Sequence, residues 1–164
     1  MMKPEYLLTF LLVTGIFSPL HALDADEEQP IKVEADMLEV DDQNQISTYS
    51  GQVSLIQGSL NIQSDKLIIR FDDQGDIALM EMYGEPALLT QQDKEGKTMR
   101  GQAKRIDFEE SRSTLMLRGD AEFEHDGDLI KSQKIKINTE LNSIDAGGTE
   151  TGDRVQMLIQ PKKP

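Results

Sequence analysis

The sequence predicts an all-β protein whose strands form one antiparallel sheet with an apolar face, rolled or folded over on itself. Between residues 115 and 124, apolar residues or glycine occupy the odd positions and mostly charged residues the even ones. This period of two is typical of antiparallel strands that are buried on one side and solvated on the other. The alternation returns at 134–137, and we find no convincing amphipathic helix after residue 22.

A motif of eight residues occurs four times in the chain, which indicates a repeated structural unit. Each copy places a small residue before two polar or flexible positions, after which apolar residues alternate with variable ones. The copies span 33–40, 62–69, 101–108 and 130–137, with Ala35, Ser64, Ala103 and Ser132 as their small residues. A second recurring element begins with glycine and stands at 51–53, 84–86 and 119–121.

Each copy of the motif is expected to bend its strand, for a reason that is plainest in the second copy. Ile62 and Ser64 lie on one face of a regular strand, and Leu67 and Ile69 likewise share a face. The step between the two pairs is odd, so a period of two cannot bring both pairs to the same side. We therefore expect a bend or bulge at Asp65–Lys66 and its equivalent in every copy, which would roll the sheet up.

The remaining strands follow in order from short alternating segments separated by turn residues. Strands are expected at 30–35, 49–55, 60–64 and 155–159. Clusters of Asp, Asn, Gln and Gly predict turns at 41–44, 57–58, 72–76 and 126–127. The turn at 72–76 is faintly similar to a calcium-binding loop, but its glycine stands at the wrong position and a hairpin turn is favoured.

The N-terminus has the composition of a secretory signal rather than of a folded element. Lys3 precedes an apolar run at 6–17 that is too short to span a bilayer, and Ala22 offers a cleavage site. We predict a cleaved signal peptide at 1–22, the alternative being an uncleaved membrane anchor. The mature chain then consists of an acidic leader, one β-domain and a short basic tail, at 23–29, 30–160 and 161–164.

The composition argues against several classes of function. A formal net charge of -13 disfavours binding to nucleic acid or to anionic membrane surfaces. Cysteine is absent, so the chain forms no disulfide and no thiolate metal site. After the predicted signal peptide the chain has a single histidine, His125. Its place beside a turn favours the interpretation as a turn residue over a catalytic one. Carboxylates fall in turns or at outward positions, so we expect no enzyme, no metal and no cofactor.

The apolar face of the sheet has two interpretations that periodicity cannot separate. Its Val, Ile, Leu and Met side chains fill an ordinary core, or two parts of the sheet stay far enough apart to hold an acyl chain. Each buried methylene contributes ~0.8 kcal/mol, so a long acyl chain contributes about 10 kcal/mol when it is shielded from water. Aromatic residues make up 5% of the chain, which argues against a platform for stacking sugars.

Four blocks of sequence, at 30–36, 49–62, 65–67 and 83–87, resemble the OstA-like family of lipopolysaccharide-transport proteins of Gram-negative bacteria. The order and spacing of the blocks are specific, and the resemblance covers essentially the whole mature chain. It implies a twisted antiparallel β-jellyroll, open at both ends, with an apolar interior groove. It also implies a periplasmic bridge that carries lipopolysaccharide from the inner-membrane transporter to the outer-membrane translocon. By the same resemblance, both partners are expected to have related jellyroll domains that join edge to edge, and copies of the protein are expected to join head to tail.

The resemblance further implies where the ligand and the partners bind. It places Ile31 and Leu89 on the lipid groove, which we expect to hold the acyl chains of lipid A. Other inward apolar positions complete the expected lining: Val33, Val53, Leu55, Leu67, Ile69, Leu117, Phe123, Ile135 and Ile137. The edge strand that faces the inner-membrane partner consists of Ile31, Lys32, Val33, Glu34, Ala35 and Asp36. The opposite edge strand, for the translocon or another copy, consists of Arg154, Val155, Gln156, Met157, Leu158 and Ile159.

Two other functions stay open at this point. A structural or chaperone module would use the same edge strands but keep a filled core, and it would bind its partners without lipid. A carbohydrate-active enzyme would need an exposed pair of carboxylates at hydrolytic spacing.

Overall fold

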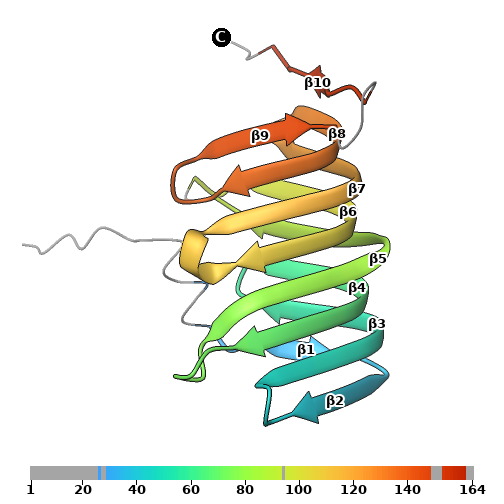
Figure 1. Cartoon of the computed structure of the whole chain (residues 1–164). Coiled ribbons are helices and arrows are strands. Elements are labelled where there is room, and N and C mark those ends of the chain that lie inside the picture. The colour runs from blue at the N-terminus through green and yellow to red at the C-terminus, as the bar shows by residue number, and fades with distance from the viewer. Residues whose placement is uncertain (1–25, 27–28, 94, 149–152, 162–164) are drawn as a thin grey trace, which may run out of the picture.

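A computed structural model describes residues 26, 29–93, 95–148 and 153–161, which form one antiparallel sheet of ten strands (Figure 1). The strands are β1 (Lys32–Glu34), β2 (Met37–Asp41), β3 (Ile46–Gln57), β4 (Leu60–Phe71), β5 (Ile77–Gln92), β6 (Thr98–Glu109), β7 (Thr114–His125), β8 (Asp128–Asn138), β9 (Ser143–Gly147) and β10 (Gln156–Leu158). A short 3-10 helix, η1 (Glu110–Arg112), joins β6 to β7. The predicted all-β, antiparallel fold is confirmed.

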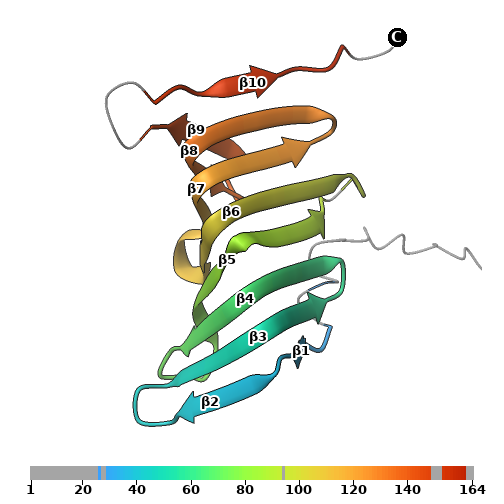
Figure 2. The ribbon, with the colours of Figure 1, turned by 90° about the vertical axis from the view of Figure 1, so that its right-hand side faces the viewer.

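The sheet is folded over along its length, so that the long strands β3 to β8 each contribute to two facing sides (Figure 2). We name these the β1 side and the β2 side after their first strands. The β1 side runs from β1, paired with 54–56 of β3, to β10, paired with 129–131 of β8. The β2 side runs from β2, paired with 46–50, to β9, paired with 134–138. The result is a jellyroll that ends in an unpaired strand edge at each end of each side.

The line along which the sheet folds lies where the repeated motif predicts a bend. β4 continues through Asp65 without a break, but its pairing with β3 shifts register between Ser50 and Val53. Gly51 and Gln52 there oppose the single residue Asp65, which makes a β-bulge. Both bulge residues have positive φ, 80° and 45°, which glycine adopts without steric cost. The inserted residues thus belong to the neighbouring strand rather than to the motif itself.

The second recurring element supplies the corresponding insertions in β5 and β7. In β5 the insertion is 84–86 and includes a cis Glu85–Pro86 bond, and in β7 it is 119–120. The first copy of the motif bends at 35–36, where the chain is divided between β1 and β2. The motif and the glycine element therefore lie opposite each other in neighbouring strands and act together. The glycine element supplies the inserted residues, and the motif supplies the strand segment that they oppose, so that each pair folds the sheet over the core.

The core lies between the two sides and consists of residues that point inward from both. Ile62 and Ser64 on the β1 side and Leu67 and Ile69 on the β2 side are all buried, as the expected change of register requires. Each large apolar side chain that is fully buried contributes about 1.5–3 kcal/mol to folding. The largest of them come from β3 to β8 and are Leu55, Ile62, Leu67, Met82, Ile106, Leu117 and Ile135.

The predicted turns are present between the strands. Asp126 and Gly127 join β7 to β8 with φ of 52° and 86°, as a two-residue hairpin requires. In the turn at 72–76, the Asp72 carboxylate accepts hydrogen bonds from the backbone of Gln74 and Asp76, both at 2.9 Å. This turn is closed by its own backbone, and across the described residues no group of three or more His, Cys, Asp or Glu is placed to hold a metal ion.

The predicted signal peptide at 1–22 lies outside the described residues. Of the predicted leader only Asp26 and Gln29 are described, and of the predicted tail only Pro161. Within the described ranges, no helix has the length and hydrophobicity needed to cross a membrane.

Candidate binding groove and edge strands

A groove of about 870 Å³ lies between the rims of the two sides, opposite the line along which the sheet folds. Its walls are largely apolar, and they come from strands of both sides. The apolar lining consists of Ile31, Leu60, Phe71, Ile77, Ala78, Met80, Leu89, Phe108 and Leu115. A volume of this size is typical of sites for small organic ligands.

The bend in the strands is what brings these side chains together. Met80 and Leu89 belong to the same strand, β5, but they lie on opposite sides of the insertion at 84–86. Both line the groove and both are 7% exposed. Leu115 of β7, on the β2 side, is 6% exposed and continues this wall beyond Phe108, which pairs with Met80. A strand without the bend would carry its two ends away from each other, and the groove would have a single wall.

The structure places the predicted lining residues in two groups. Ile31 and Leu89 line the groove. The others pack in the core beneath it, with Val33 partly buried against that core: Val53, Leu55, Leu67, Ile69, Leu117, Phe123, Ile135 and Ile137. The residues that the sequence analysis did not name are inward positions nearer the rims, such as Phe71, Met80 and Phe108. The alternation of inward and outward residues, extended toward the ends of the strands, would have identified these positions. It would not have shown that a cavity separates the side chains of the two walls.

The two rims of the groove differ in charge. Asp72, Asp76 and Glu110 line it on the β2 side, whereas Gln57 and Gln91 line it on the β1 side. Among the lining residues, the rim of the β2 side thus carries three carboxylates and the rim of the β1 side two amide groups. An anionic group at the mouth of the groove would be repelled by the carboxylates of the β2 side.

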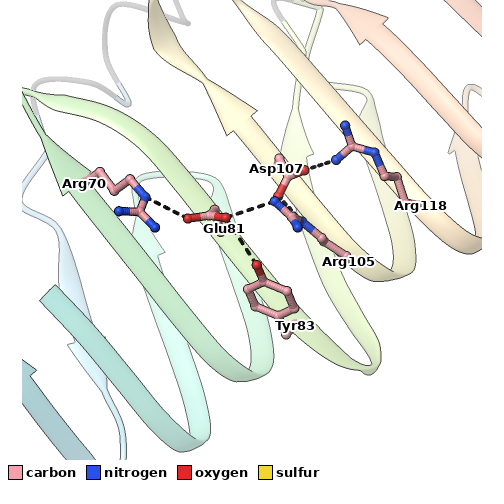
Figure 3. Close-up of polar contacts among 6 residues, drawn as sticks. All are labelled: Arg70, Glu81, Tyr83, Arg105, Asp107 and Arg118. Carbon is pink, nitrogen blue, oxygen red and sulfur yellow. Dashed lines mark hydrogen bonds and ion pairs between the residues drawn. The ribbon is translucent and has the colours of Figure 1, made fainter. Parts of the chain in front are cut away.

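A ladder of charged residues crosses the outer face of the β2 side (Figure 3). Arg70 of β4 and Arg105 of β6 both bond to Glu81 of β5 at 2.9 Å. Arg105 also bonds to Asp107 at 2.7 Å, and Arg118 of β7 contacts the same carboxylate. The two carboxylates are largely buried, at 7% and 9% exposure. Each is held by two guanidinium groups outside the groove, which favours a role in holding β4 to β7 in register over an acid–base role.

Tyr83 closes this ladder on one side. Its hydroxyl donates a hydrogen bond to Glu81 at 3.2 Å, and the Arg105 guanidinium lies 5.2 Å from the centre of its ring. Burial of the ring, together with the nearby Glu81 carboxylate, raises the pKa of the Tyr83 phenol.

His125 pairs with an acid from another turn. Its Nε2 lies 2.7 Å from Asp93 Oδ2, and the other oxygen of this carboxylate accepts bonds from the backbone of Glu95 and Lys97. Lys97 in turn bonds to Asp126 at 2.5 Å. The histidine thus joins the β5–β6 turn to the end of β7, a structural role that agrees with its interpretation as a turn residue.

The predicted edge strands lie at opposite ends of the sheet (Figure 1). β1 contains Lys32, Val33 and Glu34, with Ile31, Ala35 and Asp36 beside it, and β10 contains Gln156, Met157 and Leu158. Arg154, Val155 and Ile159 flank β10. Apolar side chains that are more than half exposed gather at these ends: Met37, Leu38, Val40, Met157, Leu158 and Ile159.

β2 and β9 form the free edges of the β2 side, and neither is among the edge strands predicted from the sequence. Leu38 of β2 is 53% exposed and Ile144 of β9 is 42% exposed, so each end of the jellyroll presents two strand edges and part of its apolar interior. The alternation of residue types in β2 was a usable signal, because the first copy of the repeated motif includes it.

Sequence comparison relates most of the chain to known proteins. The family model described as "LptA/(LptD N-terminal domain) LPS transport protein" matches residues 32–143. Lipopolysaccharide export system protein LptH of Pseudomonas aeruginosa is 30% identical over 149 residues, which cover 87% of this chain and 85% of that protein. Lipopolysaccharide export system protein LptA of Escherichia coli K12 is 28% identical over 146 residues, with 88% and 78% covered.

Structural comparison agrees. The crystal structure of LptH from Pseudomonas aeruginosa, described as the LptA homologous periplasmic component of the conserved lipopolysaccharide transport device, matches with a TM-score of 0.75. It is 26% identical, and the match covers 84% of this chain and 99% of that one. The likeness therefore extends over most of the fold.

Proposed function

The chain belongs to the family of LptA and LptD N-terminal domain lipopolysaccharide transport proteins, and we propose that it is a periplasmic bridge for lipopolysaccharide. In this role it takes lipopolysaccharide from the inner-membrane transporter and passes it toward the outer-membrane translocon. It acts without catalysis and without a cofactor. The acyl chains of lipid A lie in the groove, and the sugar part of the molecule stays in solvent.

The observation that supports this proposal most directly is the groove of about 870 Å³ with apolar walls on both sides. Ile31 and Leu89, on which the family resemblance places the lipid path, are both part of its lining. Each methylene group that moves from water into such a groove contributes ~0.8 kcal/mol, so several acyl chains would be held firmly yet without a fixed pattern of polar contacts. This suits a carrier that must release its cargo.

The unpaired strand edges support the proposed partners. An exposed edge strand can add to the sheet of a neighbouring domain through backbone hydrogen bonds. We assign the edge at 31–36 to the inner-membrane jellyroll partner, and the edge at 154–159 to the translocon jellyroll domain or to another copy. Because the two edges differ, a contact between copies is head to tail and leaves both outer ends open, which generates a filament. The grooves of successive copies would then form a path for the lipid.

Periplasmic location follows in this proposal from cleavage of residues 1–22 after export. The mature chain would begin at Leu23, and intact-mass measurement of the protein isolated from the periplasm tests this directly. A chain that keeps Met1 to Ala22 and sediments with membranes would instead favour the anchored form.

Site-specific photo-crosslinking tests the proposed lipid path. A photoreactive amino acid at Leu89 or Leu115 places the probe in opposite walls of the groove, and the matched control at Lys66 is exposed on the outer face of β4. We expect lipopolysaccharide to be captured at the two groove positions and not at Lys66. Equal or absent capture at all three positions, in folded protein, would overturn the lipid path.

The alternative of a structural or chaperone module rests on the same exposed edges. It requires normal binding of partner jellyroll domains by a protein that never holds lipid. The crosslinking experiment separates the two, because only the bridge function requires capture inside the groove.

A further inference from the structure

In the turn between β3 and β4, the backbone and the side chain of Ser59 hold the carboxylate of Asp26. The Asp26 carboxylate accepts a hydrogen bond from the backbone N–H of Ser59 at 2.9 Å. It also accepts one from the Ser59 hydroxyl. The Ser59 oxygen in turn accepts a hydrogen bond from the backbone N–H of Gln92 at 3.1 Å, which fixes its orientation. Two donors thus point at one carboxylate.

The turn is shaped for this contact. Gly58 has a φ of 55°, and a β-carbon at this position would collide with the side chain and backbone of Asp26. A residue without a side chain is therefore required for the carboxylate to approach Ser59. On the other side of the turn, Gln57 donates from Nε2 to the Gln29 carbonyl at 3.2 Å, which holds Gln29 against the same rim.

This site lies at the mouth of the apolar groove. Gln57 and Leu60, which flank the turn on both sides, line the groove, and so does Gln91, which precedes Gln92. Ile31, a few residues after Asp26, lines it as well. Ser59 is partly buried, and the polar groove residues on its rim, Gln57 and Gln91, carry amide groups. A molecule whose chains lay in the groove would carry its polar end past the Ser59 hydroxyl.

We propose that Ser59 and the β3–β4 turn bind the anionic headgroup of an acylated ligand, and that the Asp26 carboxylate occupies this site when no ligand is present. This inference rests on the proposed function, because it requires acyl chains in the groove. The shared chemistry is a phosphate or carboxylate oxygen in place of the two oxygens of Asp26. Ligand binding displaces Asp26, so its carboxylate competes with the headgroup for the same donors.

The chemistry of the site sets its limits. The donors are a backbone N–H and a hydroxyl, both neutral. Because their hydrogen bonds do not compensate the cost of removing an anion from water, a free anion binds weakly here. Acyl chains held in the groove raise the effective concentration of the attached headgroup at the turn, and binding of the two parts is then cooperative. Competition with Asp26 lowers the apparent affinity by the fraction of molecules whose site is open.

Calorimetric titration of the mature protein tests the proposal with three probes. These are dodecyl phosphate, the neutral dodecyl maltoside, and inorganic phosphate, with both amphiphiles below their critical micelle concentrations. The variant Asp26→Ala empties the site. Its matched control, Asp73→Ala, removes the same charge from the turn at 72–76, whose residues Asp72 and Asp76 line the opposite rim. We expect Asp26→Ala to tighten dodecyl phosphate binding by about tenfold, if the site is closed about nine-tenths of the time. Binding of dodecyl maltoside should change less than about twofold, and Asp73→Ala should not reproduce the difference.

Adding Ser59→Ala to Asp26→Ala should then weaken dodecyl phosphate by about tenfold, since a hydrogen bond to a charged group is lost. Ser143→Ala, on the exposed end of β9, is the control for serine removal. Equal tightening of both amphiphiles by Asp26→Ala would show a lid over the groove and overturn the headgroup site. Inorganic phosphate that binds as well as dodecyl phosphate would overturn it in favour of a free-anion site. If neither amphiphile binds to any variant, both the lipid groove and the headgroup site are overturned. If both amphiphiles bind with the same affinity to every variant, the lipid groove stands and the headgroup site alone is overturned.

Discussion

Glu81 of β5 and Asp107 of β6 lie directly opposite each other in the sheet, and Arg105 bonds to both carboxylates. Like charges at directly paired positions normally destabilise a sheet. Here Arg105 lies between them, and Arg70 and Arg118 hold their outer sides (Figure 3). The ladder therefore turns a repulsive pair of carboxylates into a set of ion pairs that requires one register of the strands. It fixes the register of the central strands on the outer face of the sheet, where solvent would not.

The first prediction concerns Arg105. Replacing it by methionine keeps the aliphatic stem but leaves two largely buried carboxylates facing each other. We expect Arg105→Met to lower the free energy of unfolding by about 2 kcal/mol, the order of a hydrogen bond to a charged group. Urea unfolding followed by circular dichroism measures this loss. Adding Glu81→Gln should restore a large part of it, because the repulsion is then gone, and a purely additive double variant would contradict the bridging role.

Tyr83 should give the protein a pH-dependent signal. Because its phenol pKa is raised by burial and by Glu81, the folded state holds this proton more tightly than the unfolded chain does. The resulting stabilisation is fully present below about pH 10, the ordinary tyrosine pKa, and is lost as pH rises through the folded-state pKa. Absorbance at 295 nm should show a late-titrating phenol that Tyr83→Phe removes and Tyr49→Phe keeps. Disappearance of the late phase in Tyr49→Phe would refute the assignment.

Leu117 tests the core between the two sides. The Leu117 side chain is fully buried and packs beside Gly101. A β-carbon added to Gly101 would lie 3.2 Å from Leu117 Cδ2. We expect Leu117→Ala to cost about 3 kcal/mol of stability through lost burial and a residual cavity. The matched control, Leu141→Ala, changes a leucine that is 74% exposed and should cost less than about 0.5 kcal/mol. Similar costs for the two variants would show that the core is loosely packed at Leu117.

The C-terminal edge gives a fourth prediction. Met157 of β10 is 56% exposed, so Met157→Asp should leave the unfolding free energy of the isolated protein almost unchanged. If this edge joins the next copy, a charge there should weaken self-association by about tenfold or more, as burying an unpaired charge is costly. Sedimentation velocity over a range of protein concentrations measures this. The control is Leu88→Asp on the outer face of the central strand β5, and equal effects of the two substitutions would count against the edge.

The repeated motif was the most informative feature of the sequence. The odd step between Ser64 and Leu67 predicted a change of register at Asp65, and the structure has it there. What the motif did not reveal is that the additional residues come from the neighbouring strands, at Gly51–Gln52 and its equivalents. A bulge is a relation between two strands, so one strand read alone shows that it is needed but not which strand supplies it.

The candidate groove was predicted less completely than the fold. Inward-facing positions such as Leu55, Leu117 and Ile135 followed from alternation, and the structure buries all three. They lie in the core rather than on the groove, whose walls include Met80 and Leu115. Alternation reports only which way a side chain points. Whether it meets a facing side chain or a cavity depends on the distance between the two sides of the sheet.

The sequence by itself determined the class of fold, the antiparallel pairing, the places where strands bend and the residues that turn inward. These follow from local rules: the period of two along a strand, and the conformational preferences of glycine and of turn residues. Only the tertiary structure decided that the two sides part at their rims, that one rim is acidic, and that Asp26 reaches Ser59. Those relations join residues far apart in the chain, and they depend on how sharply successive bends turn the sheet, an angle that no local pattern encodes.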